Sequence, residues 1–213
     1  MCNQQAVRKS AAEVASHFRV EQIDMFNVPE EVFPGTPGMV VHEDGGKRRL
    51  QAMTWGFPRP QLAKRTGLPI KPKAVYNARD DRLGIAFWQS SFAQRRCLIP
   101  MTEWAEAEGE EGRMTRTWFS LPHTDLFAVA GIWRRSDEWG SVYSMVTVTS
   151  CAQMDGINDR MPVVLAPEDW QRWMQGTPEE ASKLLRTCHA LAVDRTSEPW
   201  GKPRTGSRTP TLL

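Results

Sequence analysis

The chain has 213 residues, of which 40% are hydrophobic and 24% are charged, and its formal net charge is +2. This length suits one sizeable hydrophobic core, and the small net charge does not by itself place the chain among strongly basic nucleic-acid binders. The sequence contains neither a signal peptide nor an apolar run of about 18 residues, so we expect a cytoplasmic protein without a membrane anchor.

The cysteines do not form the spaced pairs that hold zinc. They stand alone at Cys2, Cys97, Cys151 and Cys188, and the histidines do not cluster with them. Tetrahedral zinc sites need four such ligands at short spacings. We therefore expect no metal and no other cofactor, and we expect free thiols in a reducing compartment.

The first half of the chain predicts one helix, a strand pair, a loop and a second helix. Residues 7–19 carry apolar side chains at helical spacing, and residues 40–41 and 50–57 are rich in strand-forming residues. Residues 58–74 are rich in proline, lysine and arginine and lack periodicity, so we predict a long surface loop there. Residues 84–94 predict a short amphipathic helix.

The second half predicts mostly strands. Strand-like segments cover 97–104, 115–121, 126–133 and 141–149. Helices are predicted at 168–175 and 178–188, with a last short strand at 190–193. Several antiparallel-type strands with a few helices indicate an α+β domain over residues 1–193. Residues 194–213 have little to bury and predict a disordered tail.

Cys2 is the residue whose chemistry is most distinctive. Removing Met1 would leave an α-amine and a thiol on the same residue, and this pair closes on an aldehyde to form a thiazolidine ring. The amine, with a pKa of about 7.7–8.0, and the thiol, at about 8.5, are both partly deprotonated near neutral pH. The competing interpretation is an incidental residue on a frayed terminus.

Three internal segments place polar residues next to predicted strand ends. They are Tyr76-Asn77-Ala78-Arg79, Pro100-Met101-Thr102-Glu103-Trp104 and Asn158-Asp159-Arg160-Met161-Pro162. Each segment alone has an ordinary interpretation, such as a solvated carboxylate or a weak local ion pair.

Together with Cys2 and Trp55-Gly56, these segments resemble, in this order, the SRAP (SOS response-associated peptidase) family of abasic site processing proteins. The resemblance covers about residues 1–193. It implies a single α+β domain of mainly antiparallel sheets with a barrel-like core and a few flanking helices. It further implies binding to abasic sites in single-stranded DNA, and we expect a monomer.

The resemblance also implies roles for individual residues. Cys2 would be both the nucleophile and the imine-forming amine, and Glu103 would be the general acid and base. Asn77 would hold the reacting atoms together. Asn158 stands where the family has a histidine, and asparagine cannot titrate, so we expect slow proton exchange when the crosslink reverses.

For DNA binding, the resemblance implies that Arg79 and Arg160 hold phosphates, with Thr149, Pro162 and Trp55 as further contacts. The basic segment 59–73 would add salt-dependent attraction. The family name refers to self-removal of Met1, but a general methionine aminopeptidase also accepts cysteine at the second position, and we favour that route. The imine would also permit a weak lyase activity at abasic sites.

The chain departs from the family beyond Asn158. Asn3-Gln4-Gln5 replaces an arginine-containing start, the segment after Gly56 lacks the tryptophans that wedge against bases, and residues 106–111 are acidic and are expected to face away from DNA. Three alternatives therefore stay open. They are a noncovalent single-strand DNA-binding module, an amide hydrolase with an N-terminal nucleophile, and a protein-binding domain with a tryptophan-rich surface.

Overall fold

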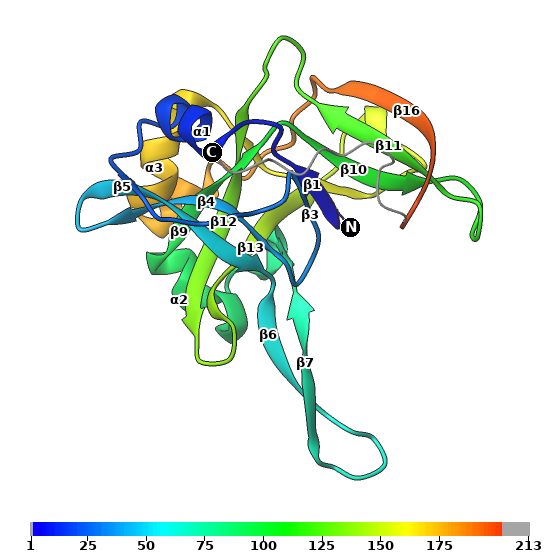
Figure 1. The fold of residues 1–213 in the computed structure, drawn as a ribbon, viewed down its shortest axis with the longest axis horizontal. Coiled ribbons are helices and arrows are strands. Elements are labelled where there is room, and N and C mark those ends of the chain that lie inside the picture. Colours follow the sequence, from blue (N-terminus) through cyan, green and yellow to red (C-terminus); the bar gives the residue numbers. More distant parts are fainter. Residues whose placement is uncertain (1, 202–213) are drawn as a thin grey trace.

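The computed structural model describes residues 2–201 (Figure 1). Its strands form a large sheet, a smaller sheet and a separate two-stranded hairpin, with short helices at the periphery. Within these residues no helix has the length and apolar character needed to cross a membrane.

The large sheet closes on itself. Its strands follow the spatial order β14 (Arg160–Pro162), β13 (Gly140–Thr149), β12 (Phe127–Ser136), β9 (Arg96–Met101), β4 (Pro37–Asp44), β5 (Lys47–Trp55) and β2 (Gln22–Ile23). A parallel contact of β5 with β13, the strands second from each end of this order, closes the sheet into a barrel, with Trp55 opposite Tyr143. The predicted α+β fold with antiparallel sheets and a barrel-like core is confirmed.

Two short strands attach to the barrel. β8 (Asn77–Arg79) pairs in parallel with β13, and β15 (Val164–Leu165) pairs with β12. Apolar side chains from the barrel strands fill the interior, and Trp55, Trp104 and Trp173 are among the largest side chains that are fully buried. The barrel therefore gives β8 and its polar residues a rigid support.

The smaller sheet holds the start of the chain between the strands β10 and β3. Its strands follow the order β16 (Ala192–Pro199), β11 (Thr115–Ser120), β10 (Glu103–Glu108), β1 (Gln4–Ala6) and β3 (Glu31–Val32). The strand predicted over 97–104 is in fact two strands, because the chain passes from β9 in the barrel to β10 in this sheet at Thr102.

Strand β16 spans the predicted domain boundary. It continues to Pro199 and pairs with β11 up to Thr115, so ordered structure crosses the expected division between residues 193 and 194. Polar residues in β16 are tolerated because this strand lies at the edge of the sheet, where half of its side chains face solvent. The rest of the predicted disordered tail, residues 202–213, lies outside the described residues.

The helices are short and lie around the barrel. They are α1 (Ala11–His17), α2 (Ala86–Gln94), α3 (Trp170–Gln175) and α4 (Pro178–Ser182), with single 3-10 turns η1 (Asp80–Arg82), η2 (Ala152–Met154) and η3 (Pro167–Asp169). Ser10 and Glu13 cap α1, and Thr177 and Glu180 cap α4, through reciprocal side-chain bonds. The helix predicted over 178–188 ends early, at Ser182.

Residues 58–74 are not the long loop that composition predicted. β6 (Phe57–Leu62) and β7 (Pro69–Val75) pair as an antiparallel hairpin that projects from the barrel (Figure 1). The prolines argued against strands in this segment. A two-stranded ribbon, however, consists only of edge strands, where a missing N–H group is tolerated. We call residues 57–75 the basic arm, because its charged residues are Arg59, Lys64, Arg65, Lys71 and Lys73.

Candidate active site

Cys2 lies just before β1 and is fully buried. Its thiol is directed toward the backbone oxygen of Gln4, 3.7 Å from Sγ, and its own backbone oxygen accepts a hydrogen bond of 2.7 Å from Nδ2 of Asn77. Asn77 is the first residue of β8, which is fastened to β13 with Met145 opposite Asn77. The structure therefore brings together Cys2 and Asn77, two residues that the sequence singled out separately.

The carboxyl group beside Cys2 belongs to Glu106, which the sequence analysis assigned to a loop facing away from DNA. Glu106 lies within β10 and is almost fully buried. Burial raises the pKa of Glu106 to about 7, although the positive charge of the amino terminus and the side-chain amide of Asn158 lower it. A carboxyl group with this pKa can both donate and accept a proton near neutral pH.

Glu106 and Cys2 also influence each other. Burial raises the pKa of the Cys2 thiol well above its usual value, and the charge of Glu106 raises it further. The thiol is therefore protonated when Glu106 is ionised. In this arrangement the Glu106 carboxylate is a base that could remove the thiol proton.

Glu103, the predicted acid and base, lies elsewhere. Its Oε1 is 2.6 Å from Nε of Arg8, in an ion pair on the other face of β10. Side chains alternate along a strand, so residues 103 and 106 cannot share a face. The Glu-Trp dipeptide that singled out Glu103 therefore does not bring its carboxyl to the inner face of β10, where Glu106 lies. The alternation itself was the missed signal, because the buried Trp104 places Glu106 on the inner face.

Asn158 lies in the turn before β14 and faces Glu106. Its Oδ1 accepts a hydrogen bond of 3.2 Å from the backbone N–H of Arg160, which orients the side chain so that the amide group lowers the pKa of Glu106. Cys2, Asn77, Glu106 and Asn158 thus form one group. Three of these were predicted, and the fourth replaces Glu103.

This group carries polar atoms that lack hydrogen-bond partners among residues 2–201. They are Oδ1 of Asn77, Oε1 of Glu106 and Oε1 of Gln5, which lies in β1 close to the group. Buried polar atoms are nearly always paired in folded proteins. Three unpaired acceptors near Cys2 indicate a site that can bond a ligand.

The predicted phosphate-binding residues divide into exposed and buried ones. Arg79 is exposed, and its guanidinium contacts Asp81 at 2.9 Å in a surface ion pair of the kind that contributes little to stability. Thr149 is also exposed, at the end of β13. Both stand on the neighbouring strands β8 and β13, so a phosphate backbone could reach them together.

Arg160 and Pro162 are buried within β14, contrary to their expected role as open DNA contacts. Arg160 Nη2 lies 2.5 Å from Oδ1 of Asp80 and also donates to the backbone oxygen of Thr147. Its guanidinium therefore fastens η1 to the barrel. The Arg160 side chain is buried while that of Asp80 is partly exposed, so in this structure the guanidinium is occupied by contacts within the protein.

Trp55 is also a core residue and not a DNA contact. It is fully buried, stacks on Tyr143 at a ring separation of 6.2 Å, and donates from Nε1 to the backbone oxygen of Tyr76 at 2.9 Å. Because Tyr76 precedes Asn77, this bond helps to place Asn77. Trp55 of the Trp-Gly motif thus supports the site from the core, through the backbone of Tyr76.

Comparison with known families decides the identity. Residues 1–199 match the family model described as SOS response associated peptidase (SRAP). The chain belongs to the SRAP family. The match ends at Pro199, the last residue of β16.

Among curated relatives, this SRAP chain is 25% identical over 185 residues to the abasic site processing protein YobE of Bacillus subtilis, covering 82% of each chain. It is 25% identical over 204 residues to the abasic site processing protein YoqW of the same organism, covering 89% of this chain and 88% of YoqW.

Solved structures share the SRAP fold seen here. A protein from Bordetella bronchiseptica superimposes with a TM-score of 0.75 at 19% identity, covering 92% of this chain and 99% of its own. A protein from Bacteroides thetaiotaomicron gives a TM-score of 0.73 at 18% identity, covering 91% of both chains. At these identities the likeness supports the fold alone.

Proposed function

We propose that the protein shields abasic sites in single-stranded DNA by forming a covalent thiazolidine through Cys2 after Met1 is removed. The observation that carries this proposal is the meeting of Cys2, Asn77, Glu106 and Asn158, which are far apart in sequence, around the start of the chain. The names of the relatives YobE and YoqW point to abasic sites as the substrate.

The first step forms an imine. An abasic deoxyribose opens to its aldehyde, and the Cys2 α-amine, bared by loss of Met1, attacks the aldehyde carbon. The protonated Glu106 carboxyl gives its proton to the departing hydroxyl, which leaves as water, and an iminium ion and a Glu106 carboxylate remain. A pKa of about 7 keeps a large share of Glu106 protonated for this step.

The second step closes the ring. The Glu106 carboxylate takes the proton of the Cys2 thiol, and the sulfur forms a bond to the iminium carbon, whose double bond becomes a single bond to a neutral amine. One water molecule is lost overall, and Glu106 ends protonated as it began. The same iminium ion would permit a weak β-elimination, the basis of lyase activity.

The two asparagines have different roles in this scheme. Asn77 fixes the backbone of Cys2 through its 2.7 Å bond, which holds amine and thiol in one place; such orientation is worth several kcal/mol in favourable cases, on the order of 7 or more. Asn158 orients the carboxyl of Glu106 without titrating. We infer that reversal is slow, because the asparagine at position 158 cannot take up or release a proton as a histidine there would.

The strand of DNA would run along exposed residues next to this group. The basic arm joins the site directly, because β7 leads through Tyr76 into Asn77. No acidic residue lies between residues 57 and 79, so the arm and the exposed Arg79 present one sign of charge. Removal of Met1 by a general aminopeptidase remains part of the proposal.

A denaturing gel tests the proposal. The processed protein is incubated with a single-stranded oligonucleotide that carries one abasic site, and we expect a band that survives denaturation. Cys2→Ala should abolish this band, and Glu111→Gln, which changes an exposed loop carboxylate, should leave it unchanged. Native-gel binding without any covalent band in the processed protein would instead establish the noncovalent module.

A further inference from the structure

The start of the chain is anchored by more than its backbone ladder. β1 has only three residues and its neighbour β3 has two, and chain ends held so briefly usually fray. Side chains supplement the ladder. Gln4 donates from Nε2 to Oε2 of Glu31 at 2.9 Å, and Gln5 donates from Nε2 to the hydroxyl of Tyr143 at 2.5 Å.

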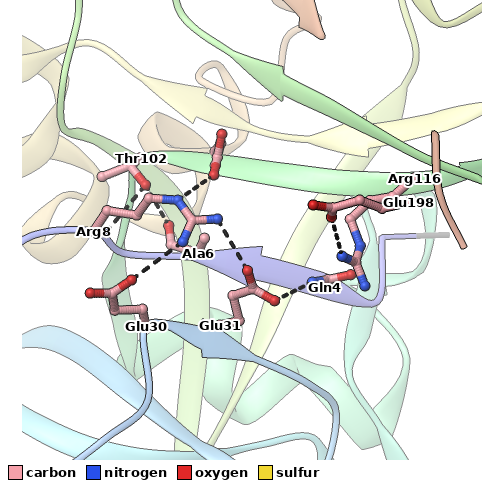
Figure 2. Close-up of polar contacts among 9 residues, drawn as sticks. Gln4, Ala6, Arg8, Glu30, Glu31, Thr102, Arg116 and Glu198 are labelled. Carbon is pink, nitrogen blue, oxygen red and sulfur yellow. Dashed lines mark hydrogen bonds and ion pairs between the residues drawn. The ribbon is translucent and has the colours of Figure 1, made fainter. Parts of the chain in front are cut away.

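Arg8 is the centre of this anchoring. Its guanidinium contacts Glu103 at 2.6 Å, Glu31 at 3.2 Å and Glu30 at 3.3 Å. Figure 2 shows Glu31 between Arg8 and Gln4, so that one carboxylate links Arg8, two residues beyond the end of β1, to the first residue of β1. We call Arg8, Glu30, Glu31 and Glu103 the Arg8 cluster.

The Arg8 cluster acts on the site only through β1. Gln4 and Ala6 pair with Ala105 and Glu103, so they share the outer face of the sheet, whereas Glu106 lies on the inner face. No member of the cluster is among the reacting groups. Their effect on chemistry would come from holding the backbone that carries Cys2.

The attachment of β1 to the sheet depends on the positive charge of Arg8. One cation is surrounded by three carboxylates, and the side chain of Glu31 is only 9% exposed. Removing the cation would leave like charges on β3, on β10 and on the segment before β3, with little solvent to screen the buried one. Repulsion between these carboxylates would then push β1 and β3 away from β10.

We propose that Arg8 and Glu31 are positioning residues that hold β1 in register, so that Cys2 stays against Asn77 and Glu106. This inference rests on the proposed function for its consequence in crosslinking. The anchoring itself can be measured without DNA, because Cys2 and Cys97 are both fully buried thiols and only Cys2 depends on β1.

The test compares alkylation of the two thiols by iodoacetamide in the folded protein, followed by peptide mass spectrometry. In Arg8→Gln and Glu31→Gln we expect Cys2 to react about tenfold faster or more while Cys97 is unchanged, because only β1 opens locally. Arg49→Gln is the matched control, since Arg49 also holds two carboxylates, Asp24 and Asp44, far from β1.

Crosslinking to the abasic oligonucleotide supplies the second measurement. We expect Arg8→Gln to slow it about tenfold, because small displacements of reacting groups are costly, and Arg8→Lys to recover part of the rate. Unchanged Cys2 alkylation, or a parallel rise at Cys97, would overturn the proposal. If the wild type forms no crosslink, the proposed function fails, while selective Cys2 alkylation in the variants would still support the anchoring.

Discussion

The two faces of strand β10 differ in how fully their polar groups are paired. On the outer face, Glu103 is held by Arg8 and belongs to a network of ion pairs. On the inner face, Glu106 is buried with one carboxyl oxygen unpaired and a raised pKa. Ion pairing stabilises the fold, whereas an unpaired buried carboxyl reduces stability and retains reactivity. Three residues of sequence therefore separate a structural glutamate from a candidate catalytic one.

Replacing each carboxylate in turn tests whether Glu106, and not Glu103, is the catalytic glutamate of β10. Glu106→Gln should lower the crosslinking rate by about 10²-fold or more, because general acid–base catalysis is lost. Glu103→Gln should have a much smaller effect, since it only weakens one contact of Arg8. Single-turnover rates on abasic single-stranded DNA measure both. A larger loss in Glu103→Gln would restore the original assignment and contradict ours.

The pH dependence of folding stability tests whether burial holds Glu106 in its protonated form. Glu106 has a raised pKa in the folded state, so the folded protein holds a proton that the unfolded chain releases, and stability falls as pH rises from about 4.5 to about 7. Relative to wild type, Glu106→Gln should gain stability between pH 5 and pH 8, by up to about 3 kcal/mol.

Denaturant titrations of wild type and Glu106→Gln at the two pH values measure this gain. Glu111→Gln serves as the control, because its carboxylate is exposed in the loop after β10 and should not alter the pH dependence. Equal differences between Glu106→Gln and wild type at both pH values would mean that Glu106 is not held neutral by burial.

Substitutions in the basic arm should have a smaller effect, on DNA affinity. Lys64 and Arg65 are exposed at its tip, and replacing both with glutamine should weaken binding to single-stranded DNA several-fold. The slope of log affinity against log salt should also fall by about 1.4, or about 0.7 for each lost phosphate contact. Lys47→Gln with Lys183→Gln, two exposed lysines outside the arm, is the control. An identical loss in the control would assign the effect to net charge alone.

The smallest expected effect concerns reversal. Asn158→His places a titratable ring beside Glu106, and we expect it to speed release of a preformed crosslink about threefold to tenfold. Release is followed by chasing with unlabelled abasic DNA. Faster release from the wild type than from Asn158→His would show that asparagine does not slow proton exchange here.

Local sequence indicated some residues of the candidate site and not others. Cys2 and Asn77 were identifiable because their motifs are local, and the structure joins them by a direct bond. The barrel core was foreseeable from the resemblance and from strands rich in β-branched residues. The alternation of Glu106 with the buried Trp104 places Glu106 on the inner face only if both residues belong to one strand, and where that strand begins is decided by tertiary contacts at Thr102.

Burial explains the other corrections. Arg160 and Trp55 belong to motifs with chemical character, yet a guanidinium or an indole can equally serve the core when partners such as Asp80 and Tyr76 are supplied by distant segments. Sequence spacing alone does not reveal such partners. Likewise, the proline-rich hairpin of the basic arm and the polar strand β16 form because their pairing partners, not their own composition, favour extended structure.

The most direct test of the central claim is the intact mass of the protein before and after incubation with an abasic oligonucleotide. We predict loss of the Met1 residue in the purified protein, then a species whose mass equals processed protein plus oligonucleotide minus one water, with the attachment mapped to Cys2. A processed protein that retains its unmodified mass, or an adduct mapped to a lysine, would contradict the account.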